Sequence, residues 1–348
     1  MVGLRSSDPR RPRRCGSGRE WANVWPLGSE RGGTSRFRPA ATGEPAPGAG
    51  TLGSYMATYL DRILAAHRDA AAADRRPLDQ LIEAARSRPP TRGFGLALSS
   101  ASARLAGAAR PSPGRAPTPA RATTPARATT PARATTPGRM AVIGEIKRRS
   151  PSKGDLAPDL VPEVLAKAYA EGGATCLSVL TDAEFFGGSA QDLAEARAAT
   201  ELPVLRKDFT VTEADVCDAR LMGADCVLLI AAALAGSSLA RCLSLASTVG
   251  MDALVEIHDE AELARALEAG ATLIGVNQRD LVSFDVDTGR AERVAAVMPE
   301  DTVRVAESGV SGPAAARRLA DAGFDAVLVG ESLVTSPDPA AAVRALRG

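Results

Sequence analysis

The stretch Ala141–Gly154, AVIGEIKRRSPSKG, sets the pattern that the rest of the chain follows. A short apolar run leads into Glu145 and Lys147, whose spacing of two places both side chains on one face of a strand. A cationic turn with Ser150 and Gly154 follows. A carboxylate beside a lysine at the end of a strand, followed by such a turn, suits acid–base chemistry on a phosphorylated molecule. The stretch by itself is equally consistent with a solvated basic turn after a buried strand.

The same alternation of strand and helix continues to the C-terminus. Short β-branched runs predict eight strands, over 141–146, 175–180, 203–206, 225–230, 252–257, 272–276, 302–306 and 325–329. Ala- and Leu-rich amphipathic segments predict the helices, over about 159–172, 190–199, 212–222, 236–249, 259–269, 287–297, 311–322 and 338–346. Eight such units favour an α/β fold, a closed (β/α)₈ TIM barrel over residues 140–348. An open doubly wound sheet is the alternative, but the fingerprint GxGxxG of such sheets is absent after the first strand.

Upstream of the barrel, the chain divides into three segments of different composition. Residues 1–54 are rich in Gly, Arg and Pro, which predicts a disordered tail; an organellar transit peptide is the alternative, and the four acidic residues count against it. Residues 55–100 are predicted to form an N-terminal helical extension, with helices over 59–74 and about 78–85. Residues 101–139 repeat the hexapeptide Thr-Pro-Ala-Arg-Ala-Thr and are predicted to be a low-complexity linker, because recurring proline blocks helix and sheet. A six-residue β-helix is the alternative, but the repeat lacks the aliphatic positions that such a coil stacks.

Charge is distributed unevenly, although the formal net charge is only +1. Residues 101–139 carry seven Arg and no acidic residue, whereas residues 140–348 carry 19 Lys and Arg against 32 acidic residues. An acidic barrel argues against a nucleic-acid-binding surface on it, and no apolar run is long enough to span a membrane. We therefore expect a cytoplasmic monomer that binds a small anionic substrate through local cations.

Cysteine and histidine give little support for a metal site. The five cysteines have no CxxC spacing, which is typical of ordinary thiols in a reducing compartment. The two histidines, His67 and His258, are too few for a His-based metal site. His67 is interpreted as a residue on a helix face rather than a ligand.

Charged and amide residues follow most of the predicted strands, at the end where barrels of this kind carry their active sites. Buried strands seldom end in charge unless the charge has a partner or a role. The candidate catalytic set comprises two lysines, three glutamates and one amide: Lys147, Lys207, Glu145, Glu256, Glu307 and Asn277. Small residues follow the last two strands, where backbone N–H groups can hold a phosphate: Ser308, Gly309 and Gly330. Such a set suits proton transfers on a sugar phosphate without a cofactor or a metal.

Eight segments, taken in order, carry a resemblance to one family. They are EIKRRSPSKG, SVLTDAEFFGGS, LPVLRKDF, GADCVLLI, LVEIH, GVNQRDL, AESGV and LVGESL. In this order they resemble indole-3-glycerol phosphate synthase, from about residue 55 to the C-terminus with a break at the repeat. The resemblance implies a carboxy-lyase of tryptophan biosynthesis that needs no cofactor. It would convert 1-(2-carboxyphenylamino)-1-deoxyribulose 5-phosphate to indole-3-glycerol phosphate, CO₂ and water.

The resemblance also implies roles for individual residues. Lys207 would be the general acid of ring closure, Lys147 the partner of the substrate carboxylate, and Glu256 the base of dehydration. Glu145 and Glu307 would hold and tune the lysines. The lysines are expected to become usable acids near neutral pH because other cations crowd them. Substrate would be positioned by Asn277 and Arg279, its phosphate bound by Ser150, Ser308, Gly309 and Gly330, and its anthranilate ring enclosed by Phe186, Phe209 and Leu228.

Three features depart from the family pattern. Residues 101–139 lie where the family has a short link between its N-terminal helices and its first strand. The second Asn of the family's common Asn-Asn-Arg is Gln278 here, and the last strand is followed by Glu331, whose charge would repel a phosphate. Three other readings stay open: another phosphate-binding barrel such as phosphoribosylanthranilate isomerase, a Schiff-base aldolase using Lys207, and a non-catalytic barrel whose Arg-rich tails bind nucleic acid or membrane.

Overall fold

The computed structural model describes residues 58–105, 140–280 and 282–348. The expected tail over residues 1–54, and all but the first five residues of the expected linker, lie outside these ranges. The part from Tyr55 to Gly348 forms one compact unit. Within the described ranges, no helix has the length and apolar character needed to cross a membrane.

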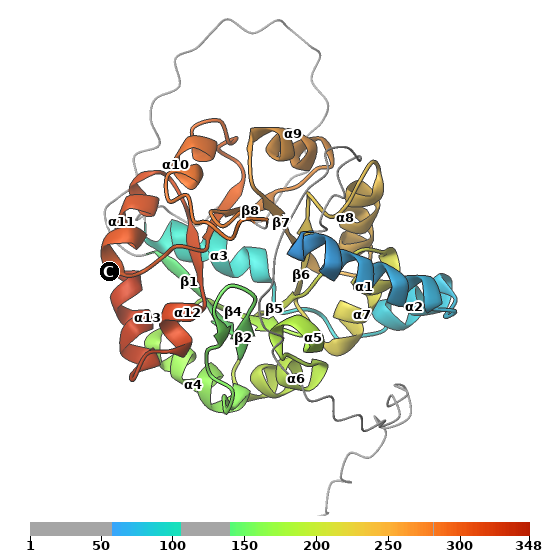
Figure 1. The fold of residues 1–348 in the computed structure, drawn as a ribbon, viewed down its shortest axis with the longest axis horizontal. Coiled ribbons are helices and arrows are strands. Elements are labelled where there is room, and N and C mark those ends of the chain that lie inside the picture. The colour runs from blue at the N-terminus through green and yellow to red at the C-terminus, as the bar shows by residue number, and fades with distance from the viewer. Residues whose placement is uncertain (1–57, 106–139, 281) are drawn as a thin grey trace, which may run out of the picture. The chain divides into compact units, whose positions relative to one another are not determined.

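Eight parallel strands close into a barrel, which confirms the predicted fold class (Figure 1). Each strand begins and ends within one residue of its predicted range: β1 Ala141–Ile146, β4 Cys176–Leu180, β5 Val204–Lys207, β6 Cys226–Ile230, β7 Asp252–Ile257, β8 Leu273–Asn277, β9 Val303–Glu307 and β10 Ala326–Val329. The barrel closes where β1 pairs with β10, with Ala141 opposite Ala326. A small antiparallel hairpin after β1, formed by β2 (Arg149–Ser150) and β3 (Gly154–Asp155), was not predicted.

Helices form a ring around these strands (Figure 1). The predicted helices are observed as α4 Pro162–Gly172, α6 Ala190–Ala199, α7 Glu213–Met222, α8 Ser238–Thr248, α9 Glu260–Glu268, α10 Arg290–Ala295, α11 Pro313–Asp321 and α13 Pro339–Arg347. Side-chain caps fix several of their starts, since Ser189, Thr212 and Asp259 each accept a hydrogen bond from a backbone N–H of the first turn. Two one-turn helices at strand ends, α5 (Ala183–Phe186) and α12 (Glu331–Val334), were not predicted.

The N-terminal extension contains three helices rather than the two predicted: α1 Tyr59–Ala73, α2 Leu78–Arg86 and α3 Phe94–Leu105. Helix α3 ends at Leu105, so it runs into the range expected to be linker. Phe94 and Leu98 are fully buried in the same apolar cluster as the inward-facing strand residues. The backbone N–H of Gly95 donates to Asp252 at 2.9 Å, which places α3 at the N-terminal end of the barrel.

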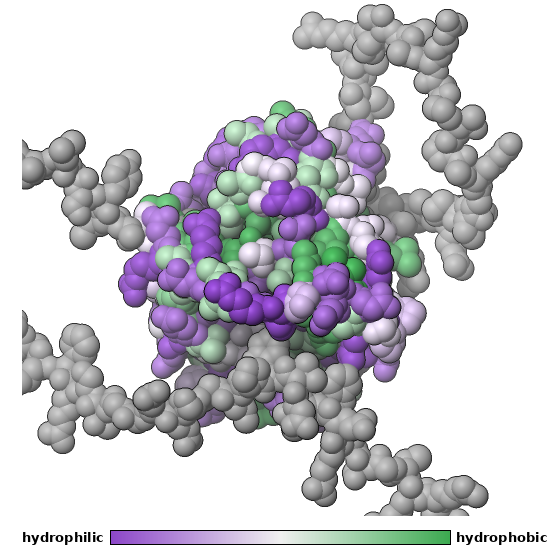
Figure 2. Space-filling model, turned by 90° about the vertical axis from the view of Figure 1, so that its right-hand side faces the viewer, coloured by the Kyte–Doolittle hydropathy of each residue, from purple (hydrophilic) through white to green (hydrophobic). Residues whose placement is uncertain are grey.

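Helix α1 lies at the opposite end. Arg68 donates to the carbonyl of Ala233, just after β6, at 3.3 Å, and Leu64 belongs to the interior apolar cluster. The extension therefore closes the bottom of the barrel with α3 and reaches over the C-terminal strand ends with α1. On the side of the molecule that carries α1 and α2, hydrophilic residues surround smaller apolar areas (Figure 2).

Candidate active site

A cavity of about 490 Å³ opens at the C-terminal ends of the strands. Its wall contains all fourteen residues that the sequence assigned to catalysis or substrate binding. They come from every strand end of the barrel, so residues up to 185 positions apart, Glu145 and Gly330, share one pocket. Their individual roles stay predictions.

Two lysines and three glutamates form the polar floor of this cavity. Lys147 Nζ lies 2.5 Å from Glu145 Oε1. Lys207 Nζ lies 3.5 Å from Glu256 Oε2 and 3.9 Å from Glu307 Oε2. The three glutamates are 4%, 1% and 1% exposed, so their charges are stable only because these cations and hydrogen bonds are present.

The expectation that cations crowd Lys207 is wrong. Burial alone would lower the pKa of Lys207, but the carboxylates of Glu256, Glu307 and Glu145 outweigh burial and raise that pKa above its ordinary value. The physical reason is that the strand ends of a closed barrel bring three glutamates to this lysine from β1, β7 and β9. Lys207 is therefore held in its protonated form by these carboxylates.

The pKa values of the three glutamates shift in different directions. Burial favours the neutral form of Glu256, but the charges of Lys207 and His258 outweigh it and lower the pKa of Glu256. For Glu307, burial and the adjacent Glu256 carboxylate raise the pKa well above its ordinary value. Burial opposes the charge of Glu145 as well, but Lys147 and Lys207 lower its pKa. The floor thus holds the ion pairs Glu145–Lys147 and Glu256–Lys207, and Glu307 is the glutamate of the three whose pKa is raised.

Asn277 and His258 surround the Glu256 carboxylate. Asn277 Nδ2 donates to Glu256 Oε1 at 3.1 Å, and the backbone N–H of Arg279 donates to Asn277 Oδ1 at 3.0 Å. His258 Nε2 lies 3.8 Å from Glu256 Oε1, while its Nδ1 lies 3.0 Å from Glu262. Sequence reasoning assigned His258 no role; its place two residues after Glu256, directly after the end of β7, was the available signal.

The phosphate-binding candidates gather at one side of the pocket. The Ser150 hydroxyl is buried and has no hydrogen-bond partner among the described residues. Ser308 and Gly309 both have left-handed backbone, with φ of 62° and 70°. Strain of this kind at a non-glycine residue is typical of functional sites. Gln278 donates to the Ser308 carbonyl at 2.8 Å, so the departure from the family pattern braces this turn.

Glu331 does not leave an unbalanced charge beside these residues. Its carboxylate lies 3.7 Å from Lys153 Nζ, which comes from the turn after β1. Both side chains are about half exposed, so this pairing is weak and reduces the repulsion of a phosphate only in part.

Aromatic side chains form the other side of the pocket. The rings of Phe186 and Phe209 lie 6.2 Å apart and are tilted by 36°, and Leu228 is 2% exposed beside them. Phe284, from the connection between β8 and α10, also lines the cavity and was not predicted. Tyr59 of α1 lies edge-on to Phe284 with ring centroids 5.6 Å apart. No local sequence pattern identifies Phe284 as a pocket residue. Only the closed barrel brings its loop to the C-terminal ends of the strands, where the cavity opens.

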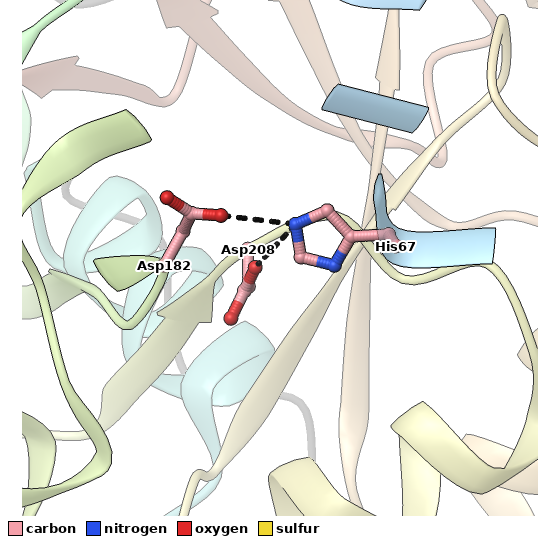
Figure 3. Close-up of side chains that lie close together, drawn as sticks. All are labelled: His67, Asp182 and Asp208. Atoms are coloured by element: carbon pink, nitrogen blue, oxygen red, sulfur yellow. Dashed lines mark hydrogen bonds and ion pairs between the residues drawn. The ribbon is translucent and has the colours of Figure 1, made fainter. Parts of the chain in front are cut away.

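One group of side chains in the described ranges has the geometry of a possible metal site. His67 of α1 and the aspartates Asp182 and Asp208, at the ends of β4 and β5, place their ligand atoms within 4.8 Å of one another (Figure 3). His67 lies on α1, as predicted, and its ring points toward these two carboxylates; whether it is a ligand stays a prediction.

A (β/α)₈ barrel with this polar floor belongs to the class of barrel enzymes that transfer protons on a small anionic substrate. The sequence model of the family "Indole-3-glycerol phosphate synthase" matches residues 108–346. The indole-3-glycerol phosphate synthase of Micrococcus luteus is 54% identical over 206 residues, which are 59% of this chain and 77% of that protein. The synthase of a Polaromonas species is 41% identical over 295 residues, 84% of this chain and 99% of that protein. The chain belongs to the indole-3-glycerol phosphate synthase family of carboxy-lyases, as its eight segments indicated.

Proposed function

We propose that this chain makes indole-3-glycerol phosphate from 1-(2-carboxyphenylamino)-1-deoxyribulose 5-phosphate, with the fourteen pocket residues in the roles below. The observation that carries this proposal is a protonated lysine, Lys207, between an aromatic wall and an anion-binding turn in one cavity. A substrate with an aryl ring at one end and a phosphate at the other fits those two sides. Its ribulose carbonyl then lies over the polar floor.

Ring closure needs an acid at the carbonyl oxygen. Lys207 donates its proton there while the ring carbon attacks the carbonyl carbon, and the carbonyl oxygen becomes a hydroxyl group. Lys147, oriented by Glu145, holds the substrate carboxylate until it leaves as CO₂. The electrons of the broken bond restore the aromatic ring. These steps take up one proton per turnover.

Dehydration needs a base and an acid on the same intermediate. Glu256, ionised beside Lys207 and fixed by Asn277, removes the proton next to the aniline nitrogen. The hydroxyl group leaves with a proton from a lysine, so water is released and the indole double bond forms. Glu307, whose Oε2 lies 3.9 Å from Lys207 Nζ, favours the protonated form of this lysine.

The protonation of Lys207 also separates this proposal from a Schiff-base aldolase. An amine attacks a carbonyl only in its neutral form, and the three carboxylates oppose that form. A cytoplasmic location stays a prediction.

One assay tests the function. Purified protein is mixed with the carboxyphenylamino substrate, and indole fluorescence and CO₂ release are followed together. Equal amounts of indole-3-glycerol phosphate and CO₂ support the proposal. Isomerisation of the substrate without CO₂, or a covalent adduct trapped by borohydride, contradicts it.

We expect Ser150→Ala to raise KM about 5- to 10-fold at nearly unchanged kcat, because the substrate phosphate loses one hydrogen bond. The folded protein should lose no stability, since the buried hydroxyl has no partner to lose in the described chain. Gly309→Val is a less specific variant: φ at Gly309 is 70° and an added Cβ would lie 2.6 Å from Val286, so folding would suffer as well.

Kinetics with and without inorganic phosphate as inhibitor measure the effect of Ser150→Ala. Thr248→Ala, at the end of α8 outside the pocket wall, is the matched control and should leave KM and phosphate inhibition unchanged. Unchanged KM and phosphate inhibition in Ser150→Ala would place the phosphate elsewhere.

A further inference from the structure

His67 connects the N-terminal extension to the aromatic side of the active site. Its Nε2 lies 3.0 Å from Asp182 Oδ2 and 3.7 Å from Asp208 Oδ1 (Figure 3). The imidazole side chain is 21% exposed and the two carboxylates are 6% and 4% exposed. One side chain of α1 therefore meets two nearly buried carboxylates from different strand ends.

Each of these aspartates fixes one phenylalanine of the aromatic wall. Asp182 Oδ1 accepts hydrogen bonds from the backbone N–H groups of Phe185 and Phe186, at 2.6 and 3.2 Å, and so begins α5. Asp208 Oδ1 accepts from the backbone N–H of Phe209 at 2.8 Å. The imidazole ring itself lies 5.6 Å from the Phe209 ring. The positions of Phe186 and Phe209 thus depend on two carboxylates that His67 holds together.

The cluster of His67, Asp182 and Asp208 suits a protonated imidazole better than a bound metal ion. Asp208 already accepts from Arg206 at 2.8 Å, and a divalent cation would sit close to that guanidinium and compete with the Phe209 N–H. Burial and the charge of Arg206 both favour the neutral imidazole. The hydrogen bond to Asp182 and the charges of Asp208 and Asp182 outweigh them and raise the pKa of His67. Imidazolium then balances two carboxylates that would otherwise repel each other.

We propose that His67 is a positioning residue for the aryl end of the substrate: it couples the docking of helix α1 to the placement of Phe186 and Phe209. The inference rests on the proposed function, because it needs an aryl group at that wall. His67 does not touch the reacting atoms and acts through Asp182 and Asp208.

The sign of the pH effect follows from the groups that face His67, which are Asp182 from the β4 end and Asp208 and Arg206 from β5. Because the folded-state pKa of His67 lies above 6.5, its contribution is complete below pH 6.5. That contribution is lost as pH rises through the folded-state pKa. We therefore expect KM for the full substrate to rise as pH increases from 6.5 through the folded-state pKa of His67. Inhibition by inorganic phosphate, which does not contact the aromatic wall, should not follow this rise.

Three variants test the proposal in the full-length protein. His67→Leu removes both contacts and should raise KM about 10-fold, with kcat within about 3-fold of the unaltered protein. His67→Gln can still donate to Asp182 and should recover most of the affinity, with the rise of KM above pH 6.5 abolished because an amide does not titrate. Arg68→Leu is the matched control, since Arg68 also ties α1 to the barrel, but through Ala233 at the end of β6.

The outcomes separate this inference from its rivals. If Arg68→Leu raises KM as much as His67→Leu, helix docking alone matters and the positioning role is overturned. If Zn²⁺ raises the melting temperature of the unaltered protein and not of His67→Leu, the group is a metal site and the proposal is overturned. If the unaltered protein forms no indole-3-glycerol phosphate, the proposed function itself is refuted. If His67→Leu turns over normally with an unchanged KM, only the positioning role is refuted.

Discussion

Lys207→Met should nearly abolish turnover while the protein still binds phosphate. We expect kcat to fall by about 100-fold or more, because the general acid of ring closure is lost. The variant should also impair Glu256, the proposed base of dehydration. Without the charge of Lys207 the pKa of Glu256 rises, so less of this carboxylate is ionised. The phosphate-binding turns lie at another side of the pocket, so inhibition by inorganic phosphate should persist.

Single-turnover and steady-state rates, measured with the melting temperature, decide this prediction. Lys167→Met is the control: Lys167 pairs with Glu163 on the outer face of α4, its side chain is 58% exposed, and its loss should leave kcat unchanged. A Lys207→Met variant that turns over within a few-fold of the unaltered protein would remove Lys207 from the mechanism.

Gly330→Ala should cost about 100-fold in kcat/KM, although it adds a single methyl group. A Cβ at this position would lie 2.3 Å from Glu145 Oε1 and 3.1 Å from Lys147 Nζ. The carboxylate would have to leave its 2.5 Å contact with Lys147, and displacement of a reacting group by about 1 Å can lower a rate by that factor. The backbone of Gly330, with φ of −115°, accepts alanine, so the effect comes from crowding alone.

Gly312→Ala provides the comparison. Its backbone is extended and an added Cβ meets no atom within 4 Å, so both stability and kcat/KM should stay as they are. Overpacking should lower the stability of Gly330→Ala by about 1–3 kcal/mol, which thermal unfolding can measure. Full activity in Gly330→Ala would mean that the Glu145–Lys147 contact is not needed in its observed form.

The barrel could be predicted because each of its signals is local. β-branched runs of four to six residues, separated by amphipathic segments, define strands and helices from neighbours in sequence alone. The site followed from the same pattern, since parallel strands in a closed barrel must bring their C-terminal ends together. That is why Lys147, Lys207 and Gly330 could be placed in one pocket before any tertiary contact was known.

Helix α3 is an element that local sequence patterns did not predict. FGLALSSASARL contains one Gly and three Ser with no clear helical period, so its intrinsic preference for helix is weak. Burial of Phe94 and Leu98 beneath the barrel stabilises it instead. Phe284 likewise became part of the pocket only because its loop folds back over the mouth.

By itself, the sequence determined the eight strand–helix units, the family and fourteen of the residues that line the pocket. Only the tertiary structure decided their charge states and partners. Lys207 is surrounded by carboxylates rather than cations, and His67 is held between two aspartates from other strands. The physical reason is that electrostatic energy depends on distances between groups far apart in the chain, whereas strands and helices depend on near neighbours.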